Sequence, residues 1–296
     1  MSKVAILLSS YNGDVFVEDQ IRSIYEQDFK DFTLYIRDDG SKPEFVAYLK
    51  SLQEKYPFVL YEGENLGFLK SFMWLVRNVD DAEYYSFADQ DDEWYPDKLS
   101  TAVKWLDEHK SDKPVLYHGA YDIVNMKGEK TGEFYYSEDG YDFRKSIMEN
   151  HYSGFAMVVN RAMREHMICA RDEKMGFHDW WAAMVAHAFG ISYSDTKKCA
   201  AHKAHGDNVT KITLGTKIKW GLKTLREESE PHNRSMEFMR CFGDKLNEKD
   251  RKVLAWFSDE KYHLGHALIK ALYPKRWRPD IVSEVVNRLL MLIGKI

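Results

Sequence analysis

Residues 4–12 read VAILLSSYN, and this stretch decides which fold the chain can adopt. Its apolar run, Val4 to Leu8, predicts a buried strand. Polar residues follow directly, from Ser9 to Asn12. The same order, an apolar run and then a polar segment, occurs three more times before residue 93. We therefore expect the N-terminal third of the chain to form one sheet whose strands end in polar loops.

Helical patterns alternate with these apolar runs. Further strands are predicted at 32–36, 58–61 and 84–87, and helices at 15–26, 43–56 and 68–79. This β-α-β-α order is typical of an α/β fold with a mostly parallel, doubly wound sheet. Such sheets bind ligands beyond the carboxyl ends of their strands. Four polar segments are expected at that edge: Ser9–Asn12, Arg37–Ser41, Glu64–Gly67 and Asp89–Asp92.

The length of 296 residues is enough for one large domain, or for a domain with a C-terminal extension. The alternating pattern weakens after about residue 110, and the chain becomes helical and rich in Lys and Arg from Gly215 onward. We expect a first domain at 1–214, with halves at 1–110 and 111–214. A helical extension is expected at 215–296.

The composition excludes several classes of protein. A net charge of −5 argues against nucleic acid as a partner, because binding a polyanion normally needs a basic face. Three cysteines, far apart in the sequence, fit reduced thiols in a cytoplasmic protein. No apolar run has the length of a signal peptide or a membrane span.

The segment Asp89-Gln90-Asp91-Asp92 is the strongest candidate for a metal site. Three carboxylates within four residues repel one another unless a cation or donor groups offset their charge. Mg²⁺ and Mn²⁺ prefer oxygen ligands and commonly bridge carboxylates to a diphosphate. Taken alone, such a segment is more often a solvated turn or a helix cap. The preceding apolar strand and the following Glu93-Trp94 favour the metal site.

Two further aspartates carry functional hypotheses. Asp39, in Asp38-Asp39-Gly40-Ser41, could accept a hydrogen bond from the imide N–H of uracil or thymine, although the pattern taken alone is more often an Asp-Gly turn without a ligand. Asp179 precedes Trp180-Trp181 and could act as a general base with a raised pKa. The alternative is a helix cap followed by a core aromatic pair. A later segment, His202–Asn208, could supply a ligand to the metal or diphosphate.

Together these motifs resemble family 2 glycosyltransferases with the GT-A fold. The resemblance covers roughly residues 3–210. It rests on Ser9-Ser10-Tyr11-Asn12, Asp38-Asp39-Gly40-Ser41, Asn65-Leu66-Gly67, Asp89-Gln90-Asp91-Asp92 and Gly154, in the family's order. Asp89–Trp94 with Lys98-Leu99, His178–Trp181 and His205–Val209 look most like its rhamnosyltransferase-like bacterial members. One departure is Ser9, which stands where many members have Thr and keeps the hydroxyl.

The resemblance implies roles by position. Residues 1–110 would form the nucleotide-binding half and 111–214 the acceptor and base half. Asp91 would bind Mn²⁺ or Mg²⁺, with His205 as a further contact to the metal or diphosphate. Asp179 would be the general base, and Trp180 and Trp181 would stack on the acceptor or sugar. The donor would be held by Ser9, Tyr11, Asp39, Asn65, Lys70 and Asp89.

The reaction implied is a single displacement with inversion at the anomeric carbon. L-Rhamnose from dTDP-rhamnose is the first candidate for the sugar. A UDP-hexose carrying galactose, glucose or an N-acetylhexosamine is the alternative. The expected acceptor is a growing bacterial cell-surface polysaccharide, carried on a lipid.

The last segment, 273–296, combines Lys275-Arg276-Trp277-Arg278 with an apolar helix. This pattern fits binding at an anionic membrane surface, which would make the protein peripheral on the inner face of the plasma membrane. A helix packed on the catalytic domain and a homodimer contact are the alternatives.

Two other function classes stay open on the sequence alone. A nucleotidyltransferase would share the α/β plan and acidic metal ligands, but usually has a Gly-rich basic loop after its first strand. Here that loop, Ser9 to Asp14, has one Gly and no basic residue. A non-catalytic nucleotide-sugar-binding module would be expected to lack the acidic cluster or the base. The absence of Gly-x-Gly-x-x-Gly and of a Walker lysine loop counts against dinucleotide oxidoreductases and P-loop kinases.

Overall fold

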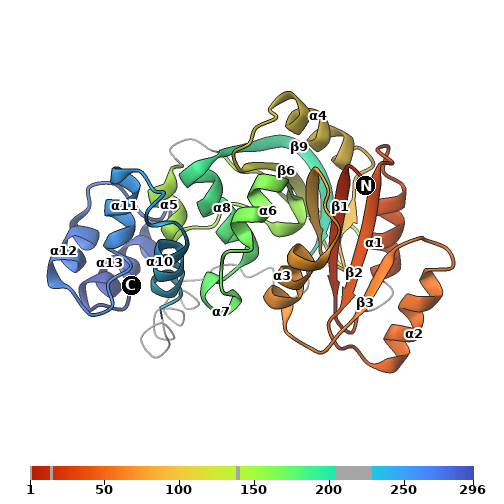
Figure 1. Ribbon diagram of the computed structural model, residues 1–296, viewed down its shortest axis with the longest axis horizontal. Helices are drawn as coiled ribbons and strands as arrows, with labels where there is room; N and C mark the ends of the chain where they lie inside the picture. The colour runs from red at the N-terminus through yellow and green to blue at the C-terminus, as the bar shows by residue number, and fades with distance from the viewer. Residues whose placement is uncertain (1, 14–15, 138–140, 205–228) are drawn as a thin grey trace.

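The computed structural model describes residues 2–13, 16–137, 141–204 and 229–296 (Figure 1). The strands are β1 (Val4–Ser10), β2 (Phe32–Asp38), β3 (Val59–Glu62), β4 (Tyr84–Ala88), β5 (Glu93–Trp94), β6 (Val115–Val124), β7 (Lys130–Phe134), β8 (Met157–Asn160) and β9 (Ile191–Lys203). The helices of the catalytic part are α1 (Phe16–Tyr25), α2 (Pro43–Leu52), α3 (Phe68–Asn78), α4 (Lys98–Glu108), α5 (Phe143–Met148), the 3₁₀ turn η1 (Gly154–Ala156), α6 (Arg161–Met167), α7 (Asp172–Met175) and α8 (His178–Phe189). The extension holds α10 (Glu230–Phe242), α11 (Glu248–Ala255), α12 (Leu264–Leu272) and α13 (Ile281–Leu292).

The strands form one sheet in the order β3-β2-β1-β4-β8-β6-β9-β5, with β7 paired to β6. The first four strands are parallel, as the sequence predicts. Strand β8 runs antiparallel to β4 and β6, and β9 is parallel to β6 and antiparallel to β5. The carboxyl ends of β1, β2, β3 and β4 therefore lie at one edge, where the four polar loops begin.

The sheet is covered by helices on both faces, which explains why β1 is apolar on both faces from Val4 to Leu8. Ala5 and Leu7 belong to one core, while Ile6 and Leu8 belong to the other, because successive side chains of a strand point to opposite faces. Helices α3, α6 and α8 contribute to the first core, and α1, α2 and α4 to the second. Both cores sit directly beneath the polar edge and fix its loops.

The C-terminal helices lie at the opposite end of the molecule from the N-terminus (Figure 1). They share the core of the catalytic part, because Trp181 of α8 packs against Phe238 and Phe242 of α10. The expected boundary at residues 214 and 215 lies outside the described residues and stays a prediction. Trp277, expected beside basic residues at a membrane surface, is instead fully buried between Phe257 and Tyr273.

Candidate active site

The loop after β1 is tied to the loops after β2 and β4. The backbone N–H of Asn12 donates to Ser41 Oγ (2.8 Å), and the N–H of Lys42 donates to Asn12 Oδ1 (2.9 Å). Asn12 has a φ of 43°, a left-handed conformation that Asn adopts more readily than most residues. The Gln90 side chain accepts from the Tyr11 N–H (3.0 Å) and donates to the Tyr11 carbonyl (3.3 Å). These bonds hold three of the four loops as one surface.

Asp39 ties the fourth loop to the others. Its carboxylate accepts from the N–H groups of Leu66 and Gly67, each at 2.8 Å, and it is paired with Arg37. Gly40 has a φ of +79°, and a Cβ there would lie 2.6 Å from the backbone nitrogen of Asn65. Asp39 is buried and both of its oxygens have internal partners. A contact from Asp39 to a base imide stays a prediction.

The other predicted donor contacts lie around this frame. Ser9 donates from Oγ to Ser71 Oγ (2.6 Å), so its hydroxyl is joined to α3. Tyr11 has an exposed fraction of 48% and is available to a ligand. Asn65 and Lys70 are exposed, just before and within the first turn of α3. The sequence prediction for these residues is compatible with their positions and is not tested by them.

The three acidic side chains after β4 converge in a protected place. Burial, together with the charges of Asp92 and Asp91, raises the pKa of Asp89 well above its ordinary value. Asp92, to which the sequence assigned no role, is fully buried and accepts a hydrogen bond from His202 at Nδ1 (2.7 Å). Burial raises the pKa of Asp92, while the bond to His202 works in the opposite direction.

His202 is a site residue that sequence reasoning did not single out from its segment. It lies near the end of β9 and stacks on Phe155, with ring centroids 4.9 Å apart and planes 7° apart. Burial disfavours its charged form, but the bond to Asp92 and the charges of Asp89 and Asp91 outweigh burial and raise the pKa of His202. No local pattern in β9 could have shown this, because the partner is 110 residues away.

The acidic side chains fit a hard divalent cation. Burial and their mutual repulsion raise the pKa values of Asp89 and Asp92, and the buried Oδ2 of Asp92 has no hydrogen-bond partner among the described residues. Carboxylate oxygens are the ligands that Mg²⁺ and Mn²⁺ prefer. Asp89 and Asp91 are only partly buried, whereas Asp92 is fully buried, and the role of Asp91 as the metal ligand stays a prediction. The other predicted contact, His205, lies outside the described residues.

A buried lysine lies behind the cluster. Lys98 donates from Nζ to the Phe155 carbonyl and sits 3.7 Å from the centroid of the Trp94 ring. Burial lowers the pKa of Lys98 to about 8, while the charges of Asp92 and Asp89 favour its protonated form. A positive charge beneath the acidic side chains reduces their repulsion, which helps to keep the cluster compact.

Asp179, the candidate base, lies in the first turn of α8. Its carboxylate accepts from the Trp180 N–H (2.7 Å), and the Asn150 side chain also hydrogen-bonds to it. Burial raises the pKa of Asp179 to about 6 in spite of these bonds. The charge of Asp179 also raises the pKa of Asp89, although it contributes less than burial and the charges of Asp92 and Asp91. The candidate base and the acidic cluster therefore belong to one site, although 90 residues separate them.

The neighbouring His178 holds this end of α8 in place. Its ring stacks on Phe72, with centroids 4.6 Å apart, and also contacts Phe68 and Phe87. Burial lowers the pKa of His178 to about 3, so the ring is neutral near pH 7. A Cβ on Gly154 would lie 2.5 Å from His178 Nε2, which explains why this position has no side chain.

The two tryptophans that follow have different surroundings. Trp181 is fully buried against α10, so the expectation that it stacks on a sugar is wrong. Helical geometry points adjacent residues in directions about 100° apart, and here the second indole faces the core. Trp180 is partly buried, donates from Nε1 to the Ser146 carbonyl (2.6 Å), and has the Arg234 guanidinium 3.5 Å from its ring centroid. Phe177, with an exposed fraction of 46%, is an aromatic beside Asp179 that the sequence analysis missed.

Comparison with known proteins agrees with this geometry. The profile described as Glycosyl transferase family 2 matches residues 5–168, and the chain belongs to this family. It is 26% identical over 231 residues to the dTDP-rhamnosyl transferase RfbG of Shigella flexneri, covering 72% of this chain and 76% of that protein. It is 30% identical over 179 residues to the GalNAc(5)-diNAcBac-PP-undecaprenol beta-1,3-glucosyltransferase of Campylobacter jejuni subsp. jejuni.

That second match covers 56% of this chain and 54% of the Campylobacter protein, so the chain spans about half of that relative's length. Among solved structures, S. aureus TarS 1-349 in complex with UDP is similar in fold, with a TM-score of 0.56, 14% identity, and coverage of 99% of this chain and 90% of that one. The predicted GT-A fold with a helical C-terminal region is confirmed. The chain is a family 2 glycosyltransferase that uses a nucleotide sugar, with rhamnosyltransferase-like relatives among bacteria.

Proposed function

We propose that this glycosyltransferase moves L-rhamnose from dTDP-rhamnose to a hydroxyl of a growing, lipid-linked bacterial cell-surface polysaccharide, with inversion. One observation carries the proposal: His178, the neighbour of Asp179, packs on Phe87 of β4 with ring centroids 4.9 Å apart, which brings the candidate base to the end of the strand that leads into the acidic cluster. A single displacement needs a general base close to the site that binds the diphosphate of the donor. The similarity to RfbG supports rhamnose as the sugar.

In this mechanism each residue has a separate task. A divalent cation held by Asp91 would neutralise the charge that develops on the leaving diphosphate. Asp179 takes the proton of the acceptor hydroxyl as the new bond forms, for which it must be ionised. Ser9, Tyr11 and Asp39 would hold the nucleoside base of the donor. The exposed Asn65 and Lys70 would lie near that nucleoside base or the phosphates.

A UDP-hexose is the second candidate donor. The name of the Campylobacter relative, a glucosyltransferase, is the observation that favours it.

To decide between the donors, the protein is incubated with Mn²⁺ and, in separate samples, with dTDP-rhamnose, UDP-glucose, UDP-galactose or UDP-N-acetylglucosamine. The released nucleoside diphosphate and the shift in melting temperature are measured for each. The proposal requires the largest release and shift with dTDP-rhamnose. A larger response to a UDP-sugar would replace rhamnose by that sugar.

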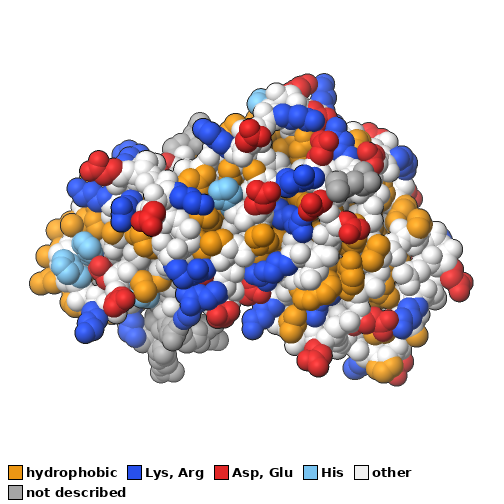
Figure 2. Space-filling model, in the orientation of Figure 1, with side chains coloured by type: hydrophobic (Ala, Val, Ile, Leu, Met, Phe, Trp, Pro, Cys, Tyr) orange, Lys and Arg blue, Asp and Glu red, His pale blue; other side chains and the backbone are white. Residues whose placement is uncertain are grey.

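The acceptor side of the proposal includes a membrane surface. Within the described residues no helix has the length and apolar character needed to span a bilayer. However, α12 and α13 expose aliphatic side chains, and hydrophobic side chains reach the surface over α12 at the left end of Figure 2. On α13 they recur every four residues, which makes one stripe. The exposed residues are Leu264, Leu268, Ile269, Leu272, Ile281, Val285, Leu289 and Ile293.

We propose that this aliphatic surface lies on an anionic bilayer, where lipid-linked acceptors are found, with the exposed Lys275 and Arg276 beside it. Deleting the segment would remove the buried Trp277, so substitutions are the better test. Leu272→Gln combined with Leu289→Gln should reduce co-sedimentation with liposomes that contain phosphatidylglycerol, at an unchanged melting temperature. Unchanged co-sedimentation, or a change from dimer to monomer in light scattering, would contradict the membrane proposal.

A further inference from the structure

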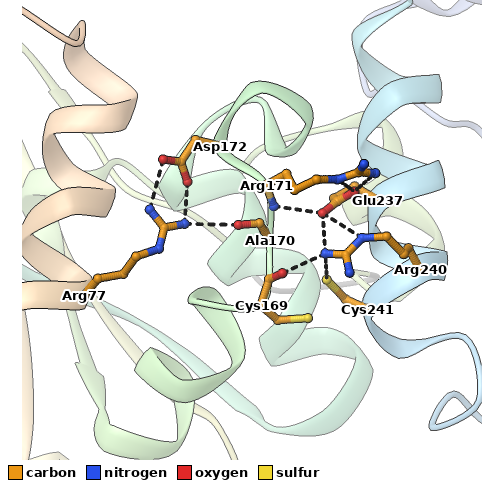
Figure 3. Close-up of polar contacts among 8 residues, drawn as sticks. All are labelled: Arg77, Cys169, Ala170, Arg171, Asp172, Glu237, Arg240 and Cys241. Atoms are coloured by element: carbon orange, nitrogen blue, oxygen red, sulfur yellow. Dashed lines mark hydrogen bonds and ion pairs between the residues drawn. The ribbon is translucent and has the colours of Figure 1, made fainter.

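A chain of ion pairs fixes the first helix of the extension to the catalytic part (Figure 3). Arg77 of α3 binds Asp172 with two hydrogen bonds, of 2.9 and 2.5 Å. The next link is Arg171, whose Nη2 lies 2.6 Å from Glu237 on α10. Glu237 also binds Arg240, which donates to the Cys169 carbonyl (2.7 Å). Helix α10 is therefore held in a defined position relative to α3 and the segment before α8.

One turn before Glu237, Arg234 points into the molecule. It is fully buried and donates from Nη2 to the Ile147 carbonyl (3.2 Å). Its guanidinium lies 3.5 Å from the centroid of the Trp180 ring. Gly176, with a φ of +83°, leaves the room that it needs, because a Cβ there would lie 2.8 Å from Arg234 Nη1. The N-terminal end of α8 is thus packed directly on this arginine.

Among the described residues, no carboxylate is bonded to the guanidinium of Arg234. Its Nε and Nη1 have no hydrogen-bond partner within the described part of the chain. Burying a guanidinium without a partner costs free energy unless a nearby negative charge compensates it. Burial lowers the pKa of Arg234 to about 9, Glu230 on the same helix and Asp179 favour its charged form, and Arg278 opposes it. Of these three charged residues, Asp179 is the one that belongs to the candidate active site.

The surroundings of Asp179 differ from one side to the other. On the side of β4 is Asp89, whose pKa is raised by burial and, to a smaller extent, by the charge of Asp179. Asn150 offers a neutral amide, and the hydroxyls of Tyr121 and Tyr136, whose pKa values burial and neighbouring charges raise, stay protonated near pH 7. His178, next in the chain, is neutral. Arg234 supplies positive charge near Asp179 from the extension.

We propose that Arg234 is a positioning residue for Asp179. It supports the indole of Trp180, and so the first turn of α8, and its charge keeps the buried carboxylate ionised as the acceptor's proton is taken. The C-terminal extension is then part of the active site. This inference rests on the proposed role of Asp179 as the base.

The test measures the pH dependence of nucleoside diphosphate release by the full-length chain, with acceptor or with water in its place. Arg234→Met should lower kcat at least about tenfold and move the acid limb of the profile up by about one pH unit, because a lost cation raises the pKa of a neighbouring acid. The KM for the donor should not change. Arg234→Lys, which keeps the charge, should return the acid limb toward the wild-type position.

Arg240→Met is the matched control, because Arg240 binds Glu237 on the same helix but does not contact Trp180. Its pH profile should equal that of the wild type. Melting temperature and donor calorimetry check the fold, and Arg234→Gln replaces Arg234→Met if the latter does not fold. An uncharged, folded variant with the wild-type acid limb and kcat would overturn the inference. Activity in Asp179→Asn would instead show that the assignment of the base had failed.

Discussion

At the scale of the residue, the site depends on aspartates that differ in burial and in hydrogen-bond partners. Asp39 is bonded on both oxygens and serves as structure. Asp92 holds His202, and Asp89 is protonated more readily than an ordinary aspartate. Asp91 and Asp179 are the two that we propose for metal binding and proton transfer. Similar side chains thus have different tasks because their burial and partners differ.

Asp91→Asn tests the metal assignment. The change removes one negative charge from the cluster and should eliminate nearly all transfer while leaving the fold intact, since the side chain is only partly buried. The measurement is release of nucleoside diphosphate with and without Mn²⁺, with melting temperature as the check on folding. Near-normal transfer by the wild type after chelation of divalent metal would contradict the assignment.

Asp179 predicts a pH dependence. The base must be ionised, and burial raises its pKa to about 6, so the rate should fall about tenfold per pH unit below pH 6 and level off above it. Asp179→Asn should abolish transfer at every pH yet still bind donor in calorimetry. An acid limb near pH 4, or an active asparagine variant, would rule out this carboxylate as the base.

At the scale of the element, two segments bring the halves of the site together. Strand β9 carries His202 to the acidic loop after β4, and α8 carries Asp179 in its first turn, which His178 holds against α3. Neither element carries a strong periodic signal for its position. The long strand has no regular alternation of apolar and polar residues, and its pairing with β5 and β6 is a long-range contact.

Gly154→Ala tests how the packing of His178 on Gly154 positions the first turn of α8. The new Cβ would lie 2.5 Å from the His178 ring, so the ring and the helix start must shift. We expect a loss of about 1–3 kcal/mol in the free energy of unfolding and a lower kcat from a displaced base. The matched control is Gly132→Ala on β7, where the nearest atom is 3.7 Å away. Equal behaviour of the two variants in denaturant titration and transfer would contradict this account.

At the scale of the whole molecule, the extension is joined to the catalytic part by a common core and by the ion pairs of Glu237. The side chain of Glu237 is fully buried, but those of Arg171 and Arg240 are about half exposed. Burial disfavours ionised Glu237, yet its bonds to Arg240 and Arg171 outweigh burial and lower its pKa from 4.5 to about 2. This contribution to stability is therefore present above pH 4.5 and is lost as the pH falls toward 2.

Glu237→Gln should reduce the free energy of unfolding by about 1–3 kcal/mol, less than for a fully buried pair because water can solvate the released arginines. Part of the loss of stability between pH 4.5 and 2 should disappear in this variant. Denaturant titrations across that range measure both effects. Glu83→Gln, which breaks the exposed pair with Lys110, is the control and should change stability by less than about 1 kcal/mol. Similar losses in both variants would exclude a special role for Glu237.

The sequence by itself determined the parallel half of the sheet and the edge that carries the site, because strands, turns and polar loop residues are local features. The four polar loops at that edge, which include Asn12, Asp39 and Asp91, could be predicted for the same reason. The tertiary structure decided which side chains face the site. Trp181 went to the core, His202 joined Asp92, and Arg234 reached α8 from the extension. These outcomes depend on contacts between residues far apart in the chain, and no local pattern contains that information.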